Sequence, residues 1–220
     1  MLQDAFAFFL LAFPGLFSIV NPLGGAFIFL AATRRLTPEL REPLARWVAI
    51  HSFTLLIVSL YVGAYVLSFF GISMPVLRVA GGIVISAAAW RMLNAEDDAK
   101  PTVDIGRLEP GSASRLAFYP LTMPITTGPG SMSVAIALGT SRPPGARNLA
   151  PFLIGSLGTV VLLCLLIYVM YRYSERIAHW MGPTGSSIVM RLSAFLLFCI
   201  GIQVLWTGVA TLSEALIVTQ

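Results

Sequence analysis

Six long apolar segments constrain the fold of this chain more than any other feature. A helix needs roughly 20 residues to cross the ~30 Å hydrocarbon layer of a bilayer, and each segment is close to that length or longer. Backbone polar groups in hydrocarbon must be paired within the segment, so we expect each to be a helix. The six segments cover residues 5–32, 47–70, 76–93, 116–138, 148–170 and 187–208.

The composition agrees with membrane-spanning helices and excludes a soluble domain. Hydrophobic residues make up 57% of the 220 residues and charged residues only 11%. A soluble domain of this length cannot bury so much apolar surface. The first segment is longer than a signal-peptide core, so we expect it to be retained. No basic cluster typical of nucleic-acid binding occurs, and the predicted fold class is an all-α membrane protein.

Two of the six segments, the first and the fourth, are interrupted near their middle by residues that break helices. Pro removes a backbone donor and Gly weakens a helix. Paired broken helices form the central solute site of many secondary transporters, whereas the alternative is two packing kinks. The candidate substrate-binding residues are Asn21, Pro22, Gly24, Gly25, Thr126, Thr127, Gly128, Pro129, Gly130 and Ser131.

The residue types at these interruptions suit a small zwitterion. Free amides at the starts of the second half-helices, at Gly24, Gly25, Gly128 and Gly130, would bind a carboxylate. Unwound carbonyls, the Asn21 side chain and the threonine hydroxyls would take an ammonium group or a Na⁺ ion. We therefore expect the two interruptions to converge near the bilayer midplane.

The two halves of the chain resemble each other when Pro129 is laid over Pro22. Further along, Gly182 matches Gly71, and Arg191 falls over Arg78 after a two-residue insertion. Three spans in each half require the second copy to enter from the opposite side, which is an inverted repeat. The predicted organisation is a first three-helix repeat over 1–93, a cytoplasmic connector over 94–115, and a second repeat with a short tail over 116–220.

The basic residues predict the orientation, because Lys and Arg are enriched in cytoplasmic loops. Ten of them lie in or beside the first, third and fifth connections and two in the others, so we expect both termini outside. The ten are Arg34, Arg35, Arg41, Arg46, Arg91, Lys100, Arg107, Arg115, Arg172 and Arg176, and the two are Arg142 and Arg147.

Two further arginines, Arg78 and Arg191, lie inside predicted spans. A charge within a span is costly and usually faces protein or water, which favours a gate or a solute contact. Both residues also lie near a helix end, so their guanidinium groups have the alternative of reaching the interface. The repeat would put the two side chains at opposite faces of the membrane, as paired gates require.

None of the ten acidic residues falls in the middle of a predicted span. An intramembrane carboxylate is the usual proton relay or cation site, so its absence disfavours proton coupling and a cationic solute. We expect no metal centre and no cofactor, with Na⁺ as a candidate coupling ion. Expected partners are a small-molecule solute and membrane lipids, and a homo-oligomer is left open.

Three short motifs resemble the MarC family: Asn21-Pro22-Leu23-Gly24, Ala80-Gly81-Gly82-Ile83 and Gly128-Pro129-Gly130. The resemblance extends over the whole chain. It implies six helices in a bacterial inner membrane and similarity to transporters of neutral amino acids such as glycine and alanine. The sequence departs from the family pattern at Phe27, where a second Pro is common, at Ser131, where Ala is common, and at Ala194, where Gly is common.

Residues and resemblance together predict a secondary transporter, not an enzyme, that moves a small neutral amino acid by alternating access. The alternative is a membrane-embedded lipid carrier, or an enzyme that handles an amphiphile at the same interruptions. Enzymatic chemistry would need several His, Asp, Glu or Cys side chains at one depth, and His51 is the only His, Asp or Glu within a span, where Cys164 and Cys199 are more simply packing residues. A third interpretation is a purely structural subunit.

Overall fold

The computed structural model describes residues 2–33, 36–94, 113–141 and 149–218, and all regular structure in these ranges is helical. The first half of the chain comprises α1 (Leu2–Val20), α2 (Pro22–Ala32), α3 (Pro38–Tyr61), α4 (Gly63–Phe69) and α5 (Met74–Leu93). The second half comprises α6 (Ala113–Leu116), the π-helical segment η1 (Ala117–Thr126), α7 (Pro129–Thr140), α8 (Leu149–Arg172) and α9 (Ser174–Val218).

The predicted apolar segments correspond to these helices, with changed ends. Five described helical stretches are long and apolar enough to cross a membrane. The fourth predicted span is not among them, because its two main pieces, η1 and α7, are only 10 and 12 residues long. The last helix begins well before the predicted residue 187 and is kinked at Gly182, where φ is 68°. Most of the predicted connector lies outside the described residues.

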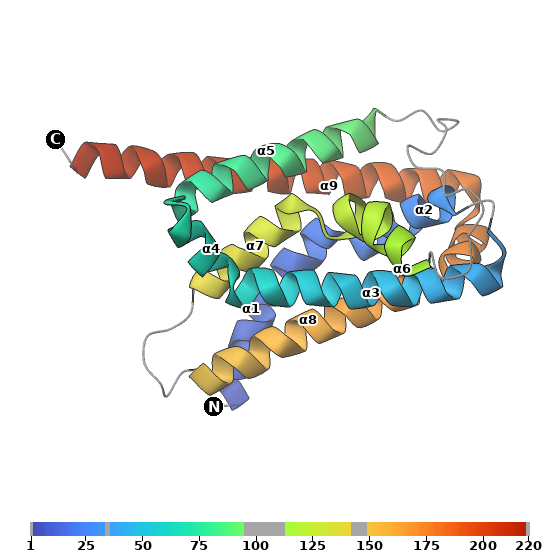
Figure 1. Cartoon of the computed structure of the whole chain (residues 1–220). Helices are drawn as coiled ribbons and strands as arrows, with labels where there is room; N and C mark the ends of the chain where they lie inside the picture. Colours follow the sequence, from blue (N-terminus) through green and yellow to red (C-terminus); the bar gives the residue numbers. More distant parts are fainter. Residues whose placement is uncertain (1, 34–35, 95–112, 142–148, 219–220) are drawn as a thin grey trace.

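Figure 1 shows the two interrupted helices between two pairs of long helices. The pair α5 and α9 lies on one side and makes the most extensive helix contact, while α3 and α8 pack together on the other. Helix α2 contacts α8 and α9, whereas α7 contacts α3 and α5. The N- and C-terminal ends lie at the same end of the bundle (Figure 1).

The main buried core joins the interrupted helices to α3 and α8. Its largest fully buried side chains include Leu16, Phe29, Leu56, Leu163 and Tyr171. A smaller buried cluster of Ile85, Ala89 and Leu197 lies between α5 and α9. Large apolar side chains on the outer faces are exposed, as expected for helices that face lipid.

Candidate functional site: two helix interruptions beside one buried tyrosine

The first interruption falls at Asn21, the residue predicted from the sequence. Asn21 has φ 46° and ψ 65°, in the left-handed region that Asn tolerates better than most residues. Its side-chain Oδ1 accepts a hydrogen bond from the Gly24 amide at 3.1 Å, and its carbonyl accepts one from the Gly25 amide at 2.8 Å. Pro22 occupies the first turn of α2, where its missing N–H costs nothing. Asn21 is therefore the N-cap of a new helix.

This capping changes the role expected for α2. The sequence interpretation treated the Gly24 and Gly25 amides as free donors for a solute carboxylate, but in the structure both donate to Asn21. An N-cap side chain satisfies donors that the helix itself leaves unpaired. A carboxylate would reach the Gly24 amide only after the Asn21 side chain rotates away.

The second interruption separates η1 from α7 and has a different geometry. Gly128 precedes α7 with an extended backbone, φ −87° and ψ −179°, and Pro129 occupies the first turn. Among the described residues no side chain caps α7; the Ser131 hydroxyl donates to the Gly128 carbonyl at 2.9 Å instead. The N–H groups at the start of α7 therefore have no side-chain acceptor in the part of the chain that the structure describes, and the helix dipole makes this end attractive to an anion.

Thr127 lies beside this uncapped helix end with an unpaired hydroxyl. Its side chain is 0% exposed, and its Oγ1 has no hydrogen-bond partner among the described residues. The neighbouring Thr126 differs, because its hydroxyl donates to the Leu121 carbonyl at 2.7 Å. An unpaired buried hydroxyl costs about 1–3 kcal/mol, and so needs an explanation such as a bound ligand.

Tyr171 of α8 connects the two interruptions and was missed in the sequence analysis. Its ring is 1% exposed and stacks on Phe29 of α2 at 4.8 Å between centroids. Its Oη lies 2.8 Å from Thr126 Oγ1, and Tyr171 is the donor because the Thr126 hydrogen is used on Leu121. On the other side, a Cβ at Gly25 would lie 2.5 Å from Oη. The Tyr171 hydroxyl therefore lies between the two interrupted helices, with Thr126 on one side and Gly25 on the other.

Tyr171 carried a signal that the sequence analysis did not use. A Tyr hydroxyl inside a span needs a hydrogen-bond partner, which often indicates a polar site within the bundle. Its position next to Arg172, at the end of an apolar segment, is equally typical of the aromatic belt at a membrane surface. Only the contacts of α8 with α2 distinguish a polar site within the bundle from an aromatic belt at the membrane surface.

The contact at Gly25 predicts a coupled pair of substitutions. We expect Gly25→Ala to lower the free energy of unfolding by about 1–3 kcal/mol, because the new methyl group overlaps the buried Tyr171 hydroxyl. Tyr171→Phe alone should cost about 1 kcal/mol through the lost hydrogen bond. The double variant should be more stable than the sum of the two effects, since the next ring atoms lie 3.3 Å or more from the added Cβ. Additive effects in an SDS-unfolding titration would contradict this geometry.

Gly130 packs against a side chain of another helix and does not face an open space. A Cβ there would overlap the Cγ1 of Ile85 on α5, a side chain that is 4% exposed. The start of α7 is thus fixed against the third span. Its close neighbour Ser133 donates to the Gly130 carbonyl at 2.7 Å, which continues this contact into the second turn.

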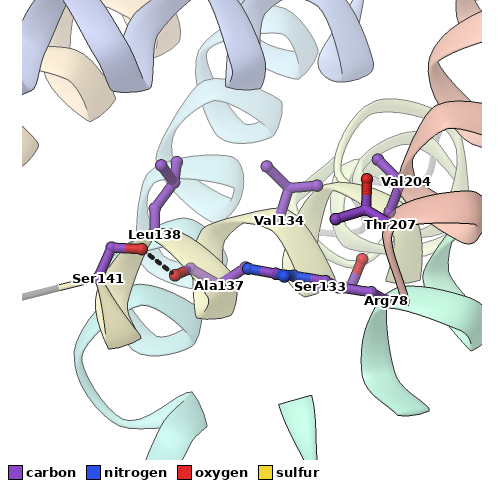
Figure 2. A pocket seen from close by; sticks show the side chains of 8 residues that line it. All are labelled: Arg78, Ser133, Val134, Ala137, Leu138, Ser141, Val204 and Thr207. Atoms are coloured by element: carbon purple, nitrogen blue, oxygen red, sulfur yellow. Dashed lines mark hydrogen bonds between the residues drawn. The ribbon is translucent and has the colours of Figure 1, made fainter. Parts of the chain in front are cut away.

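Of the two arginines proposed as gates, Arg78 lines a cavity and Arg191 does not line it. The cavity lies between α5, α7 and α9, and Figure 2 shows the side chains around it. Arg191 is exposed on α9. Arg78 shares this lining with three hydroxyl-bearing residues, Ser133, Ser141 and Thr207.

The chain matches the model of the MarC family of integral membrane proteins over residues 6–213. It is 29% identical over 204 residues to the UPF0056 membrane protein YvbG of Bacillus subtilis, covering 92% of this chain and 94% of YvbG. It is 28% identical over 215 residues to a UPF0056 membrane protein of Archaeoglobus fulgidus, with 93% of each chain covered.

A third relative, the UPF0056 inner membrane protein MarC of Citrobacter koseri, is 29% identical over 204 residues, covering 88% of this chain and 90% of that protein. No solved structure matches the chain significantly. The family match includes both interruptions and all three motifs that carried the resemblance in the sequence. The chain therefore belongs to the MarC family of integral membrane proteins.

Proposed function

We propose that this protein is a secondary transporter that moves a small neutral amino acid across the bacterial inner membrane by alternating access. The observation that carries the proposal is the meeting of the two interruptions at Tyr171, whose hydroxyl contacts Thr126 and lies against Gly25. A solute held between two broken helices would be released when either half moves. The inner-membrane location is proposed by analogy with the Citrobacter koseri relative, which is named an inner membrane protein.

The solute carboxylate binds at the start of α7 in this proposal. The uncapped amides of the first turn and the unpaired Thr127 hydroxyl are donors without described partners there. The α2 end is capped by Asn21, so it is the weaker anion site until the cap opens. The ammonium group donates hydrogen bonds to backbone carbonyls of the unwound joints. The same carbonyl oxygens are the proposed ligands of Na⁺ as the coupling ion.

Three features support the proposed inverted repeat. The matched glycines Gly71 and Gly182 both adopt left-handed backbone conformations, with φ of 67° and 68°. The matched prolines Pro22 and Pro129 both begin the second half of an interrupted helix. Helix contacts are paired in the same way, because α1 packs on α8 as η1 packs on α3, and α2 packs on α9 as α7 packs on α5.

The two ends of the bundle differ in a way that suits alternating access. The cavity at Arg78 lies at the end that carries both termini, which the charge distribution predicts to be outside. At the opposite end, Arg41 pairs with Glu175 at 2.7 Å and Arg172 with Glu42 at 2.6 Å. These ion pairs join α3 to the second half, so we assign them to an inner gate. A reporter fused after Gln220 that reads out as cytoplasmic would contradict this orientation.

Uptake and counterflow of labelled amino acids in proteoliposomes test the proposal. We expect glycine and alanine to exchange, and lysine and glutamate not to exchange. Replacing Na⁺ by choline should lower uptake if Na⁺ is the coupling ion. Failure of every neutral amino acid to exchange would contradict the transporter, and exchange of a labelled amphiphile in the same vesicles would support the lipid carrier instead.

A further inference from the structure

A cavity of about 260 Å³ lies between α5, α7 and α9, beside the second interruption and separate from the contacts of Tyr171. This volume is slightly below the ~300–1,000 Å³ of typical small-molecule pockets, so it suits a small solute. Figure 2 shows the eight side chains that line it. They are Arg78, Ser133, Val134, Ala137, Leu138, Ser141, Val204 and Thr207.

Arg78 is the only ionised side chain in this lining, and it is half-buried. It is the fifth residue of α5 and therefore lies inside a membrane-spanning helix. Such a charge is usually paired with another residue or faces water. Among the described residues, Arg78 has neither an ion-pair partner nor a hydrogen-bond acceptor. Its five N–H donors are thus available to a carboxylate, which a guanidinium binds in a bidentate manner.

The hydroxyl groups in the lining supply the complementary chemistry. Ser133 donates to the Gly130 carbonyl at 2.7 Å, and Ser141 donates to the Ala137 carbonyl at 3.0 Å. Thr207 donates to the Gln203 carbonyl at 2.8 Å. Each hydroxyl uses its single hydrogen within its own helix, so its oxygen retains lone pairs that accept from an ammonium group. One cation and three acceptor oxygens match the two ends of a zwitterion.

The cavity also adjoins the proposed solute site. Ser133 lies four residues after Pro129, just over one helical turn, and its hydroxyl bonds to a carbonyl of that first turn. Gly81 of α5 leaves room for the Ser133 side chain, because a Cβ at Gly81 would overlap its Oγ. A solute in the cavity is therefore close to the start of α7.

We propose that this cavity is an access site that binds an α-amino acid as a zwitterion, with the carboxylate on Arg78 and the ammonium group at the hydroxyl oxygens. The proposal rests on the proposed transport function and adds a second site on its path. A carboxylate without an ammonium group should bind more weakly, and an amine without a carboxylate should not bind. Arg78 then selects the solute before it reaches the interruptions.

The test measures the charge preference of a cysteine placed in the cavity. Thr207→Cys is prepared with Cys199→Ala, and the solubilised protein is treated with a negatively charged and a positively charged methanethiosulfonate of similar size. We expect the anionic reagent to react roughly tenfold faster, because a charged cleft raises the local concentration of counter-ions. Arg78→Gln should abolish this preference, and Arg78→Lys should retain much of it.

Protection and control measurements complete the test. Glycine should slow the modification, acetate should slow it less, and glycinamide should leave it unchanged. The native Cys199 is exposed on the same helix and outside the cavity lining, so its ratio of rates should not respond to Arg78→Gln. Gel filtration shows whether each variant is folded.

The outcomes separate this inference from the transport function, because no step of the labelling requires transport. Equal rates for the two reagents with Arg78 present, or a preference that survives Arg78→Gln in folded protein, would overturn the inference. So would glycinamide protecting as well as glycine does. Proteoliposomes without amino-acid exchange would instead count against the transport function, while a charge preference with glycine protection would still establish the binding site.

Discussion

Replacing Thr127 by Val is expected to leave the protein at least as stable as the wild type and to lower its transport rate about tenfold or more. The side chain is 0% exposed and its hydroxyl has no described partner. A methyl group in its place removes a desolvation cost of about 1–3 kcal/mol. If the hydroxyl donates to the solute carboxylate, the lost hydrogen bond to a charged group costs about 1.5–3 kcal/mol, which is roughly tenfold or more in affinity or rate.

Thr127→Val is expected to keep or raise stability while it lowers the transport rate. A residue at a mere kink would not lower transport, so the variant distinguishes a binding site from a kink. Thr159→Val is the matched control, because Thr159 is also fully buried but donates to the Gly155 carbonyl at 2.9 Å within α8. The control should be neutral or slightly less stable, with unchanged transport. Melting temperature in detergent and counterflow of glycine are the measurements. A stable Thr127→Val variant with wild-type counterflow would eliminate the second interruption as the solute site.

The helix interruptions were predictable because they depend on local backbone chemistry. Asn21 before Pro22 defines a helix start, since Asn accepts a left-handed backbone and Pro suits the first turn. The same rule applies at Gly128 and Pro129. The N-cap bond from Gly24 to Asn21 was equally local, and it follows from the capping preference of Asn. The Gly24 amide was instead expected to donate to a solute carboxylate, although Asn21 already carried the signal for a cap.

The partners of the interruptions were not predictable, because they lie on distant helices. Tyr171 is 45 residues from Thr126, and no periodicity indicates that α8 turns this ring toward both interruptions. Ile85 likewise reaches Gly130 from α5. The second contact affects the choice of experiment, because Gly130→Ala would overlap Ile85 whether or not a solute binds there. Thr127 is the better position for the test.

The sequence also left two interpretations of Arg78, a side chain reaching the interface or a group that faces a solute. The residue is near the helix start, as either interpretation requires. The structure adds the neighbouring helices, which carry three hydroxyls around the same cavity. Those hydroxyls come from α7 and α9, and their register against α5 depends on side-chain packing that hydropathy does not encode.

Replacing Gly82 by Ala is expected to disrupt the contact between α5 and α9 and to cost about 3 kcal/mol or more. An added Cβ would lie 2.5 Å from the Leu205 amide nitrogen, 2.7 Å from the Gly201 carbonyl oxygen and 2.7 Å from the Leu205 Cα. These are backbone atoms, so no rotamer change relieves the overlap and α9 itself has to move. An SDS-unfolding titration measures the loss, and fluorescence-detected gel filtration shows whether the variant remains monodisperse.

Gly15→Ala is the matched control, since Gly15 also lies inside a helix but an added Cβ would have no atom within 4 Å. This change should gain up to ~1 kcal/mol of helix propensity, so the two identical substitutions should shift stability in opposite directions. Wild-type stability for Gly82→Ala would mean that α5 and α9 are further apart than in the structure. The cavity at Arg78 lies between these helices and α7, so its volume and its lining would then also be wrong. The packing of Gly82 is therefore the structural condition on which the proposed access site depends.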